Sequence, residues 1–469
     1  MKQIPFNVTD SSLPELSQML DDSIMSEHFN KVLQDTQIDQ HSLYVTSCKK
    51  NWTKYKAGRS CMVCYQLHIE NLKLNQSFSL LLTARMYHPG ESSSRYKKAL
   101  REENIETRIF PGIFRIHELS LVVWSFPNDR KLKHIDTLDS EHEYLHNAIE
   151  SLALQRWGSG WMVSSFTSHP IHYVPEHAYS IRVEISLQHK KLKQRKNWTI
   201  FGKTYYDDQG ELTFKQMQSL TSAQTSGRSS VKTAIALQYE PNLKLLWQQG
   251  LSGESLNGIQ WMQQKQQLRQ AVSAVQNLHS TTLQGLPSYN LDELTQSLQQ
   301  RSEIIAKVVP EYQDQLQTVV ERLFDYLPNL KNSHQVTLHG DLHPQNLFAH
   351  NDQIALIDLD QLKRGPASVD LGSWMACCMY HSSMENQNFE QAMQQAMLFI
   401  KCYTQLSTSP PSWHEIVWFT VAALIEERLY RCQSRLKGGR LELIPVLLEW
   451  ADLLSRSTFE LELHRANGV

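Results

Sequence analysis

The sequence predicts a protein of the α+β class, with two strand-rich parts followed by a mainly helical part. Three observations support this prediction. A pattern of strands and turns occurs twice within the first 252 residues. Apolar residues then recur at helical spacing from about residue 261 onward. A short strand-rich insert that contains several His and Asp residues interrupts the helical part near residue 340.

Size and composition are those of an ordinary globular protein. The 469 residues suffice for two or three domains, with 41% hydrophobic and 20% charged residues. The net charge of −2 gives no electrostatic reason to expect nucleic acid or a membrane surface as a partner. No apolar run is long enough for a transmembrane helix, and the first residues lack the apolar core of a signal peptide. We therefore expect a cytoplasmic protein of unknown oligomeric state.

The seven cysteines do not suggest a disulfide framework, because their number is odd and they are scattered over a long chain. Cys61 and Cys64 have the CxxC spacing used by zinc and redox sites. No second CxxC or paired His follows at ligand distance, and the surrounding residues alternate as in a strand. We therefore interpret these two residues as strand cysteines.

The strand-rich parts have the appearance of two copies of one unit. Tyr55 and Tyr173 each precede a short turn and an alternating strand. Thirty residues after each Tyr, a basic residue ends a strand: Arg85 in the first copy and Lys203 in the second. A further Tyr, a Gly-containing turn and a helical stretch follow in both. Sequence identity between the copies is low, which leaves chance similarity as the alternative.

The remainder is expected to be mostly helical. Helical spacing or a helix-like composition occurs at 261–280, 291–309, 310–327, 385–404 and 413–456. The strand-rich insert lies between these segments. In it, His350-Asn351-Asp352 has the composition of a hairpin turn between two apolar strands.

The insert holds the most informative residues, LHGDLHPQNLF at 338–348 and IDLD ending at Asp360. Phosphoryl transfer from a nucleotide requires a group that orients the attacking hydroxyl, ligands for Mg²⁺ and positive charge near the phosphates. Asp341 and Asn346 offer a carboxylate and an amide on one loop. Asp358 offers a second carboxylate at the end of the next strand. Oxygen ligands of this kind suit Mg²⁺, which keeps several waters.

Two other interpretations of the insert remain open. His339, Asp341 and His343 alternate and would face one side of an extended strand, as in a metal hydrolase. However, Gly340 and Pro344 interrupt such a strand, and no third His follows at a suitable spacing. A polar turn without chemistry is the second alternative.

LHGDLHPQNLF, followed by ALIDLDQLKRGPASVDLGSW, resembles the catalytic segment of the aminoglycoside phosphotransferase and choline kinase-like family. That family has an HGDxHxxN loop followed by Ile-Asp, and the resemblance covers about 165–469. It implies a protein-kinase-like bilobal fold, with a β-rich nucleotide lobe and a mainly helical C-lobe. The first strand-rich copy would be a second, degenerate N-lobe-like unit in front of them.

This resemblance implies four parts. They are a helical segment at 1–43, an N-lobe-like repeat at 44–150, the nucleotide-binding N-lobe at 151–252 and the helical C-lobe at 253–469.

The resemblance also implies a role for each motif residue. Asp341 would be the catalytic base, and Asn346 and Asp358 would hold Mg²⁺. Lys203 would contact the α- and β-phosphates of ATP. Asp370 would be a structural residue tied to the catalytic loop.

Other motif residues receive supporting roles. His339 would pack beneath the catalytic loop, and His343 would be structural. Asp360 would be a second metal ligand or a solvated acid. The hinge that meets adenine would include three consecutive residues, Gln248, Gln249 and Gly250.

The second copy departs from the family at two positions. The family has a Gly-containing phosphate loop between its first two strands, whereas this copy has Pro175-Glu176-His177-Ala178. A helix Glu is expected to pair with Lys203, and Glu211 is the nearest Glu in the sequence. The first copy has Arg85 in place of the Lys, which argues against a nucleotide site there.

The expected function is that of a small-molecule kinase that uses ATP and Mg²⁺ to phosphorylate a hydroxyl group on a sugar, an aminoglycoside-like compound or an amino alcohol. The alternative is a degenerate, nucleotide-binding protein that acts through binding alone. A protein kinase is a weaker alternative, because an HRD-type loop and an APE segment are missing.

Overall fold

The computed structural model describes residues 9–36, 43–330, 333–351, 353–436 and 440–460. The chain divides into two compact units. The first comprises residues 1–208, 240–245 and 434–438, and the second comprises residues 209–239, 246–433 and 439–469. Both strand-rich copies thus begin in the first unit, and the division into four parts remains a prediction.

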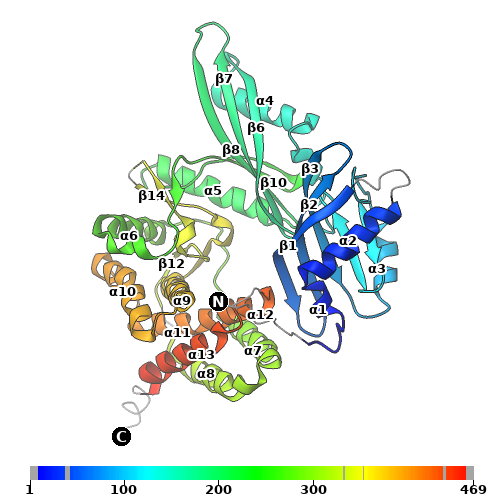
Figure 1. Ribbon diagram of the computed structural model, residues 1–469. Helices are drawn as coiled ribbons and strands as arrows, with labels where there is room; N and C mark the ends of the chain where they lie inside the picture. The colour runs from blue at the N-terminus through cyan, green and yellow to red at the C-terminus, as the bar shows by residue number, and fades with distance from the viewer. Residues whose placement is uncertain (1–8, 37–42, 331–332, 352, 437–439, 461–469) are drawn as a thin grey trace. The chain divides into compact units, whose positions relative to one another are not determined.

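The first sheet is antiparallel and has the strand order β1-β2-β3-β5-β4. Its strands are β1 (Leu43–Lys56), β2 (Ser60–Asn71), β3 (Gln76–Met86), β4 (Ile113–Ile116) and β5 (Leu121–Ser125). The helices of this copy are α1 (Leu16–Met19), α2 (Asp22–Thr36) and α3 (Ser92–Ala99). Helix α2 packs on β1 (Figure 1). The rings of Phe29 on α2 and Tyr65 on β2 meet edge to face, with their centroids 5.4 Å apart.

The second sheet repeats this order as β6-β7-β8-β10-β9. Its strands are β6 (Trp161–Val174), β7 (Ala178–His189), β8 (Arg195–Tyr205), β9 (Ala236–Glu240) and β10 (Leu245–Gln249), with α4 (Glu143–Trp157) in front of β6. The register repeats as well. Met62 pairs with Arg85 and, 118 residues further on, Ser180 pairs with Lys203. The two copies thus share strand order and register, as the predicted repeat requires.

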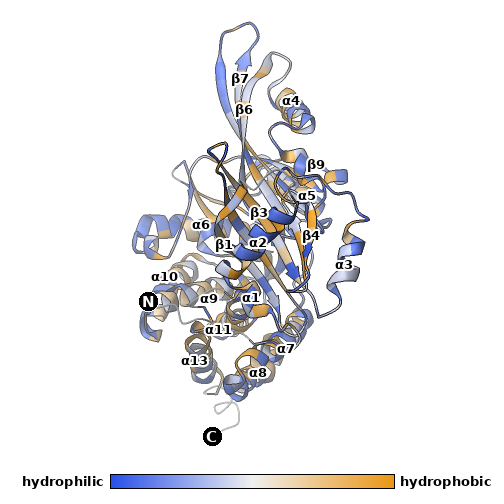
Figure 2. Ribbon diagram, turned by 45° about the vertical axis from the view of Figure 1, so that its right-hand side comes forward, coloured by the Kyte–Doolittle hydropathy of each residue, from blue (hydrophilic) through white to orange (hydrophobic). Residues whose placement is uncertain are grey.

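The prediction that Cys61 and Cys64 are strand cysteines is confirmed. Cys61 and Cys64 are buried, free thiols of β2. The basic run from His189 to Lys196 forms the β7–β8 hairpin, which is exposed and hydrophilic (Figure 2). An exposed hairpin of this kind needs no binding partner to explain its charge.

The second unit is mainly helical. Its helices are α5 (Gln209–Thr225), α6 (Lys265–Ser280), α7 (Leu291–Val308), α8 (Gln313–Tyr326), α9 (Ser368–Met384), α10 (Phe389–Leu406), α11 (Trp413–Ala423), α12 (Tyr430–Arg435) and α13 (Leu443–Ser455). Helix α9 is buried over most of its length, and α11 crosses it so closely that a side chain at Gly372 would strike the Phe419 backbone. No described helix is long and apolar enough to span a membrane.

The strand-rich insert forms two small pairings within this helical unit. β13 (Leu347–His350) and β14 (Gln353–Leu356) form the predicted hairpin, with β11 (Glu254–Ser255) beside β13. Asp352, in its turn, lies outside the described residues. β12 (Gln335–Leu338) pairs with β15 (Lys363–Pro366). The loops between these strands therefore meet at one place, where the predicted catalytic residues lie.

Candidate active site

The loop that joins β12 to β13 carries the predicted catalytic residues. Its backbone turns at Gly340, where φ is +81°, and a Cβ there would lie 2.1 Å from the backbone oxygen of Gln361. Only glycine fits this approach. Asn346 closes the loop, because its Nδ2 donates a hydrogen bond of 2.9 Å to the backbone oxygen of Asp341. This bond fixes the amide and leaves its oxygen as the atom suited to bind a metal.

Asp370, on α9, anchors the loop from below. Its carboxylate accepts hydrogen bonds from the backbone N–H groups of His339 (2.7 Å) and Gly340 (2.9 Å). His279 Nε2 lies 3.0 Å from the same carboxylate, and His279 Nδ1 lies 2.7 Å from the Tyr403 hydroxyl. Burial raises the pKa of the Asp370 carboxyl, but the bonds from His279 and His339 outweigh burial and hold its pKa below the usual value. The predicted structural tie is therefore present.

The two histidines of the motif have different surroundings. His339 is fully buried, with Nε2 3.0 Å from the backbone oxygen of Ile357 and Nδ1 3.4 Å from the Asp341 nitrogen. Both of its ring nitrogens thus face the backbone, which suits packing beneath the loop and not the metal-hydrolase interpretation. His343 Nε2 lies 3.8 Å from Asp341 Oδ2, and burial lowers the pKa of His343.

Asp358 follows β14 directly beside Asn346. The N–H of Ile357 donates a hydrogen bond of 3.1 Å to the backbone oxygen of Asn346. Asp358 then adopts a left-handed conformation with φ of +58° and is exposed. Such a conformation costs a residue with a Cβ about 1 kcal/mol and is often retained at functional sites. The backbone beside Asp358 thus lies against that of Asn346, and their joint binding of Mg²⁺ stays a prediction.

Helix α5 supports the segment after Asp358 with polar side chains that the sequence analysis missed. Gln209 Nε2 donates to the backbone oxygen of Asp360 at 2.6 Å, and Thr213 Oγ1 lies 3.4 Å from Asp360 Oδ1. Gln216 Nε2 donates to the backbone oxygen of Leu362 at 3.3 Å. Their spacing of three to four residues, on the buried side of a helix, was the available signal.

Glu211 lies elsewhere on the same helix. Its carboxylate binds Lys215 at 2.6 Å, one turn further along, and its side chain is 46% exposed. Exposed pairs at this spacing contribute only about 0.3–0.5 kcal/mol. Pairing of Glu211 with Lys203 stays a prediction.

Lys203 lies in the first unit, at the end of β8. Its side chain is half-buried, and its Nζ lies 5.2 Å from the ring centroid of Tyr205. Its backbone pairs with Ser180 of β7. The predicted hinge residues are half-buried: Gln248 and Gln249 end β10, and Gly250 follows it.

The Gln249 N–H is already used, because it donates a hydrogen bond of 2.8 Å to the backbone oxygen of Ile235. In this conformation, an adenine ring would therefore have to use other hinge groups. The Gln249 Oε1 atom is buried without a hydrogen-bond partner among the described residues. A buried acceptor of this kind favours a ligand that donates a hydrogen bond.

A cavity of about 510 Å³ in the second unit reaches Gly340 of the catalytic loop. Three acids line it: Glu293 of α7 and, on the π-helical turn Leu424–Leu429, Glu426 and Glu427. Burial raises the pKa of Glu426, whose carboxylate also bonds to Ser297. Aromatic rings of Tyr289 and Phe419 complete the lining. Lys363 also lines the cavity, and Glu426 and Glu427 are paired with Arg301 and Arg428. The aromatic rings together with Glu293 are therefore the features that suit a cationic organic molecule.

Residues 221–445 match the model of the phosphotransferase enzyme family. The match includes the catalytic loop, Asp358 and Asp370, and excludes Lys203 and Glu211. No curated protein matches the chain.

Several solved structures are similar at low identity. A choline kinase from Cryptosporidium parvum Iowa II is 12% identical, with a TM-score of 0.46 over 69% of this chain and 99% of that one. Choline kinase LicA from Streptococcus pneumoniae is also 12% identical, with a TM-score of 0.43 over 67% and 99%. A thermostable mutant of aminoglycoside phosphotransferase APH(4)-Ia, in complex with AMP-PNP and hygromycin B, is 13% identical, with a TM-score of 0.43 over 66% and 98%. Likenesses at this level say nothing about function.

The chain has the predicted α+β architecture, in which two five-stranded sheets of the same strand order precede a mainly helical part. The resemblance seen in its catalytic motif is confirmed by the match of residues 221–445 to the phosphotransferase enzyme family.

Proposed function

We propose that this protein is an ATP-dependent phosphotransferase that moves the γ-phosphoryl group to a hydroxyl group of a small molecule. The arrangement of the catalytic loop is the main support. Asp370 and Asn346 hold the loop at both ends, so the half-buried Asp341 is presented by a fixed backbone. The family match supports the same chemistry. A fixed carboxylate is what phosphoryl transfer by positioning requires.

Asp341 would act on the acceptor. Its carboxylate would accept the proton of the acceptor hydroxyl as that oxygen bonds to the γ-phosphorus. The bond between the γ-phosphorus and the β,γ-bridging oxygen breaks, and ADP leaves. Lys203, at the position that the family uses for phosphate contact, would bind the α- and β-phosphates.

The donor set fits Mg²⁺ bound together with a nucleotide. Among the described residues, no group of three or more His, Cys, Asp or Glu side chains is placed to hold a metal alone. Asn346 and Asp358 would instead provide an amide oxygen and a carboxylate, with the remaining ligands from phosphates and water. When bound, the ion would neutralise phosphate charge.

The acceptor would be a cationic hydroxyl compound, such as an amino sugar or an amino alcohol. Glu293 lines the cavity that reaches Gly340, beside the rings of Tyr289 and Phe419, and this combination favours positive charge. Suitable test compounds are choline and hygromycin B. Neutral sugars of similar size are the matched controls.

Titration calorimetry with Mg·ATP, on wild type, Asp358→Ala and Asp341→Ala, tests the proposal without an acceptor. We expect wild-type binding in the micromolar to millimolar range that requires Mg²⁺. Asp358→Ala should weaken it about tenfold or more, a loss of about 1.4 kcal/mol. Asp341→Ala should bind nearly normally but transfer no phosphoryl group.

Two other outcomes contradict the proposal. Well-folded wild type that binds no nucleotide would rule it out entirely. Binding without phosphoryl transfer to any cationic hydroxyl compound, and without slow hydrolysis of ATP, would favour the degenerate nucleotide-binding protein instead.

A further inference from the structure

The turn between the first two strands has the same construction in both repeats. In the first repeat, Gly58 occupies the turn with φ of +66°. Its N–H donates a hydrogen bond of 2.7 Å to Asp10 Oδ2, which also accepts a bond of 2.8 Å from the Tyr55 hydroxyl. One carboxylate outside the sheet thus fixes the turn through its backbone and its neighbouring Tyr.

In the second repeat, Glu176 takes the place of the glycine. Its φ is +60°, and its N–H donates a hydrogen bond of 2.9 Å to Asp129 Oδ2. The Tyr173 hydroxyl donates to the same oxygen at 2.7 Å. A side chain is unfavourable in this left-handed conformation, where glycine has no penalty. We therefore expect the Glu176 carboxylate to make contacts that offset this conformational cost.

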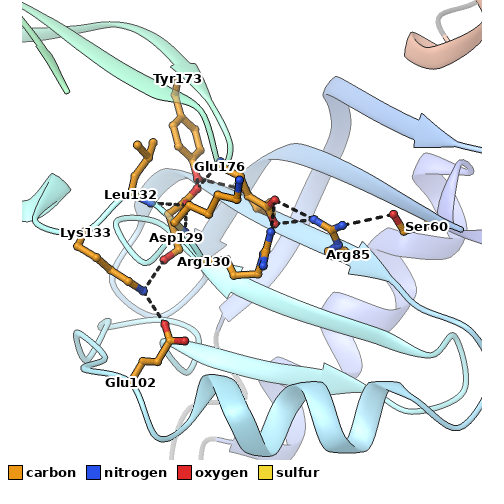
Figure 3. A network of polar contacts seen from close by, with 11 residues as sticks. Ser60, Arg85, Glu102, Asp129, Arg130, Leu132, Lys133, Tyr173 and Glu176 are labelled. Atoms are coloured by element: carbon orange, nitrogen blue, oxygen red, sulfur yellow. Dashed lines mark hydrogen bonds and ion pairs between the residues drawn. The ribbon is translucent and has the colours of Figure 1, made fainter. Parts of the chain in front are cut away.

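The carboxylate of Glu176 is held by two guanidinium groups from the first repeat and its end (Figure 3). Arg85 Nη1 lies 2.7 and 2.8 Å from its two oxygens. Arg130 makes a bidentate contact, with Nε at 2.5 Å and Nη2 at 2.6 Å. The Glu176 side chain is 11% exposed and that of Arg85 is 17% exposed, so water screens this pair less than a surface pair.

Arg85 is the structural counterpart of Lys203. The two residues occupy equivalent register positions on β3 and β8. Each lies near the ring of the Tyr two residues later, at 5.6 Å for Arg85 over Tyr87 and 5.2 Å for Lys203. The position that would contact phosphate in the second repeat thus binds a carboxylate in the first. That carboxylate comes from the turn of the second repeat.

Electrostatics favour the ionised form of Glu176. Burial raises the pKa of the Glu176 carboxyl, but hydrogen bonds and charge from Arg130 and Arg85 outweigh burial and lower its pKa. Lys54 and Lys56 are also near enough for the charge of Glu176 to affect their pKa values. Glu176 is therefore bound in a strongly cationic part of the first repeat.

The same turn adjoins the strand end that carries Lys203. The Tyr206 N–H donates a hydrogen bond of 3.2 Å to the backbone oxygen of His177, and Ala178 pairs with Tyr205. If the turn moved, the backbone at the end of β8 would therefore shift with it. In the family, the corresponding turn is the phosphate loop, which in this chain lacks glycine.

We propose that the first repeat is a clamp for this turn, with Arg85, Arg130 and Glu176 as positioning residues for nucleotide binding. The clamp substitutes an ion-pair network for a glycine-rich loop. In the first repeat, the Glu176 carboxylate also occupies the place beside Arg85 where a phosphate would bind. The first repeat is therefore no second nucleotide site. The effect on nucleotide binding rests on the proposed function, whereas the clamp itself does not.

Hydrogen exchange and Mg·ATP affinity of the full chain, measured on the same variants, test the clamp. Glu176→Gln keeps the shape and removes the charge, and Glu176→Asp keeps the charge. Glu102→Gln is the matched control, because it breaks an exposed pair of 2.7 Å with Lys133 in the same repeat. We expect amides at 173–178 to exchange about tenfold faster in Glu176→Gln. The Kd and KM for ATP should rise by about the same factor.

The maximal rate kcat should change less than twofold. Glu176→Asp should recover part of the affinity, and Glu102→Gln should resemble wild type. Unchanged exchange in Glu176→Gln would overturn the clamp. Faster exchange with unchanged Kd and KM would overturn its role in nucleotide binding. If wild type binds no Mg·ATP, the proposed function fails together with that role, and exchange alone then decides whether the clamp exists.

Discussion

Single side chains determine the shape of the catalytic loop. Asp370 is buried, and its two oxygens accept the N–H groups of His339 and Gly340, with His279 as a further partner. Loss of one member of such a buried network leaves the others without partners in a medium that solvates them poorly. The loop therefore depends on a residue that touches no substrate.

Asp370→Asn should reduce the free energy of unfolding by about 3 kcal/mol at neutral pH, since a buried charged partner is lost. The pKa of Asp370 is lowered in the folded state, so its stabilising effect is complete above the usual carboxyl range of about 4 and is lost as pH falls through the lower folded value. Urea unfolding between pH 3 and pH 7 measures both effects. The difference between wild type and the variant should shrink in acid.

Glu118→Gln is the control for this experiment, because Glu118 makes an exposed pair of 3.1 Å with Lys31. It should change stability by less than about 1 kcal/mol. An Asp370→Asn variant as stable as this control would contradict the anchoring role.

At the residue scale, the sequence predicted those contacts that depend on short separations. Asp341 and Asn346 share one loop, so their spacing alone brings them together. The partner of Asp370 was not predictable in the same way. His279 is 91 residues away, and a His at the end of an apolar helix gives no sign of which buried carboxylate it will meet.

The rotation of helix α5 about its own axis decides which of its side chains face the segment after Asp358. Its buried side carries Gln209, Thr213 and Gln216 toward the segment after Asp358, whereas Glu211 binds Lys215 at a more exposed position. Residues two apart on a helix point about 200° apart, so Gln209 and Glu211 do not share a face. Glu211 was predicted from its charge, whereas neutral donors such as Gln209 and Gln216 carry no comparable signal in a sequence.

Two substitutions on α5 separate these alternatives. Gln209→Ala should weaken Mg²⁺-dependent nucleotide binding about three- to tenfold, because it removes a bond to the backbone beside Asp358. Glu211→Gln should change it less than twofold, because an exposed pair contributes little. Calorimetry at several Mg²⁺ concentrations provides the measurement. The reverse ranking would support the predicted pairing of Glu211 with Lys203.

Element boundaries were predicted less well than element types. The helical stretch expected at 413–456 is divided into α11, a π-helical turn, α12 and α13. The π-helical turn at Leu424–Leu429 places Glu426 and Glu427 on the lining of the cavity beside Gly340. A π-turn leaves no clear periodicity in a sequence, because it shifts the helical phase by one residue only.

On the scale of the whole molecule, the duplication is the main architectural fact. The repeat was recognisable because both copies keep the spacing from Tyr to the basic residue. That α2 and α4 belong to the two repeats was not recognisable, since the sequences of these two helices are not similar. The first 43 residues were therefore predicted as a separate segment, and this division stays a prediction. Helix α2 of that segment packs on β1.

The division into two units predicts how the chain unfolds. Scanning calorimetry should resolve two transitions, because chains with separate compact units need not unfold in one step. Glu176→Gln should lower the temperature of one transition and Asp370→Asn that of the other. The double variant should show both shifts, each in its own transition, as expected when the two units unfold independently. A single transition that both substitutions shift equally would contradict this division.

The arrangement of the clamp has a consequence for biosynthesis. The residues that hold the turn, Arg85 and Arg130, precede Glu176 in the chain, and ribosomal synthesis allows N-terminal parts to fold first. The first sheet can thus be complete while the second is still being made. The turn of the second repeat would then bind, through Glu176, to two guanidinium groups that are already in place in the folded first repeat. Because the first repeat is synthesised and folded first, strands of the second repeat would be less prone to pair with strands of the first sheet.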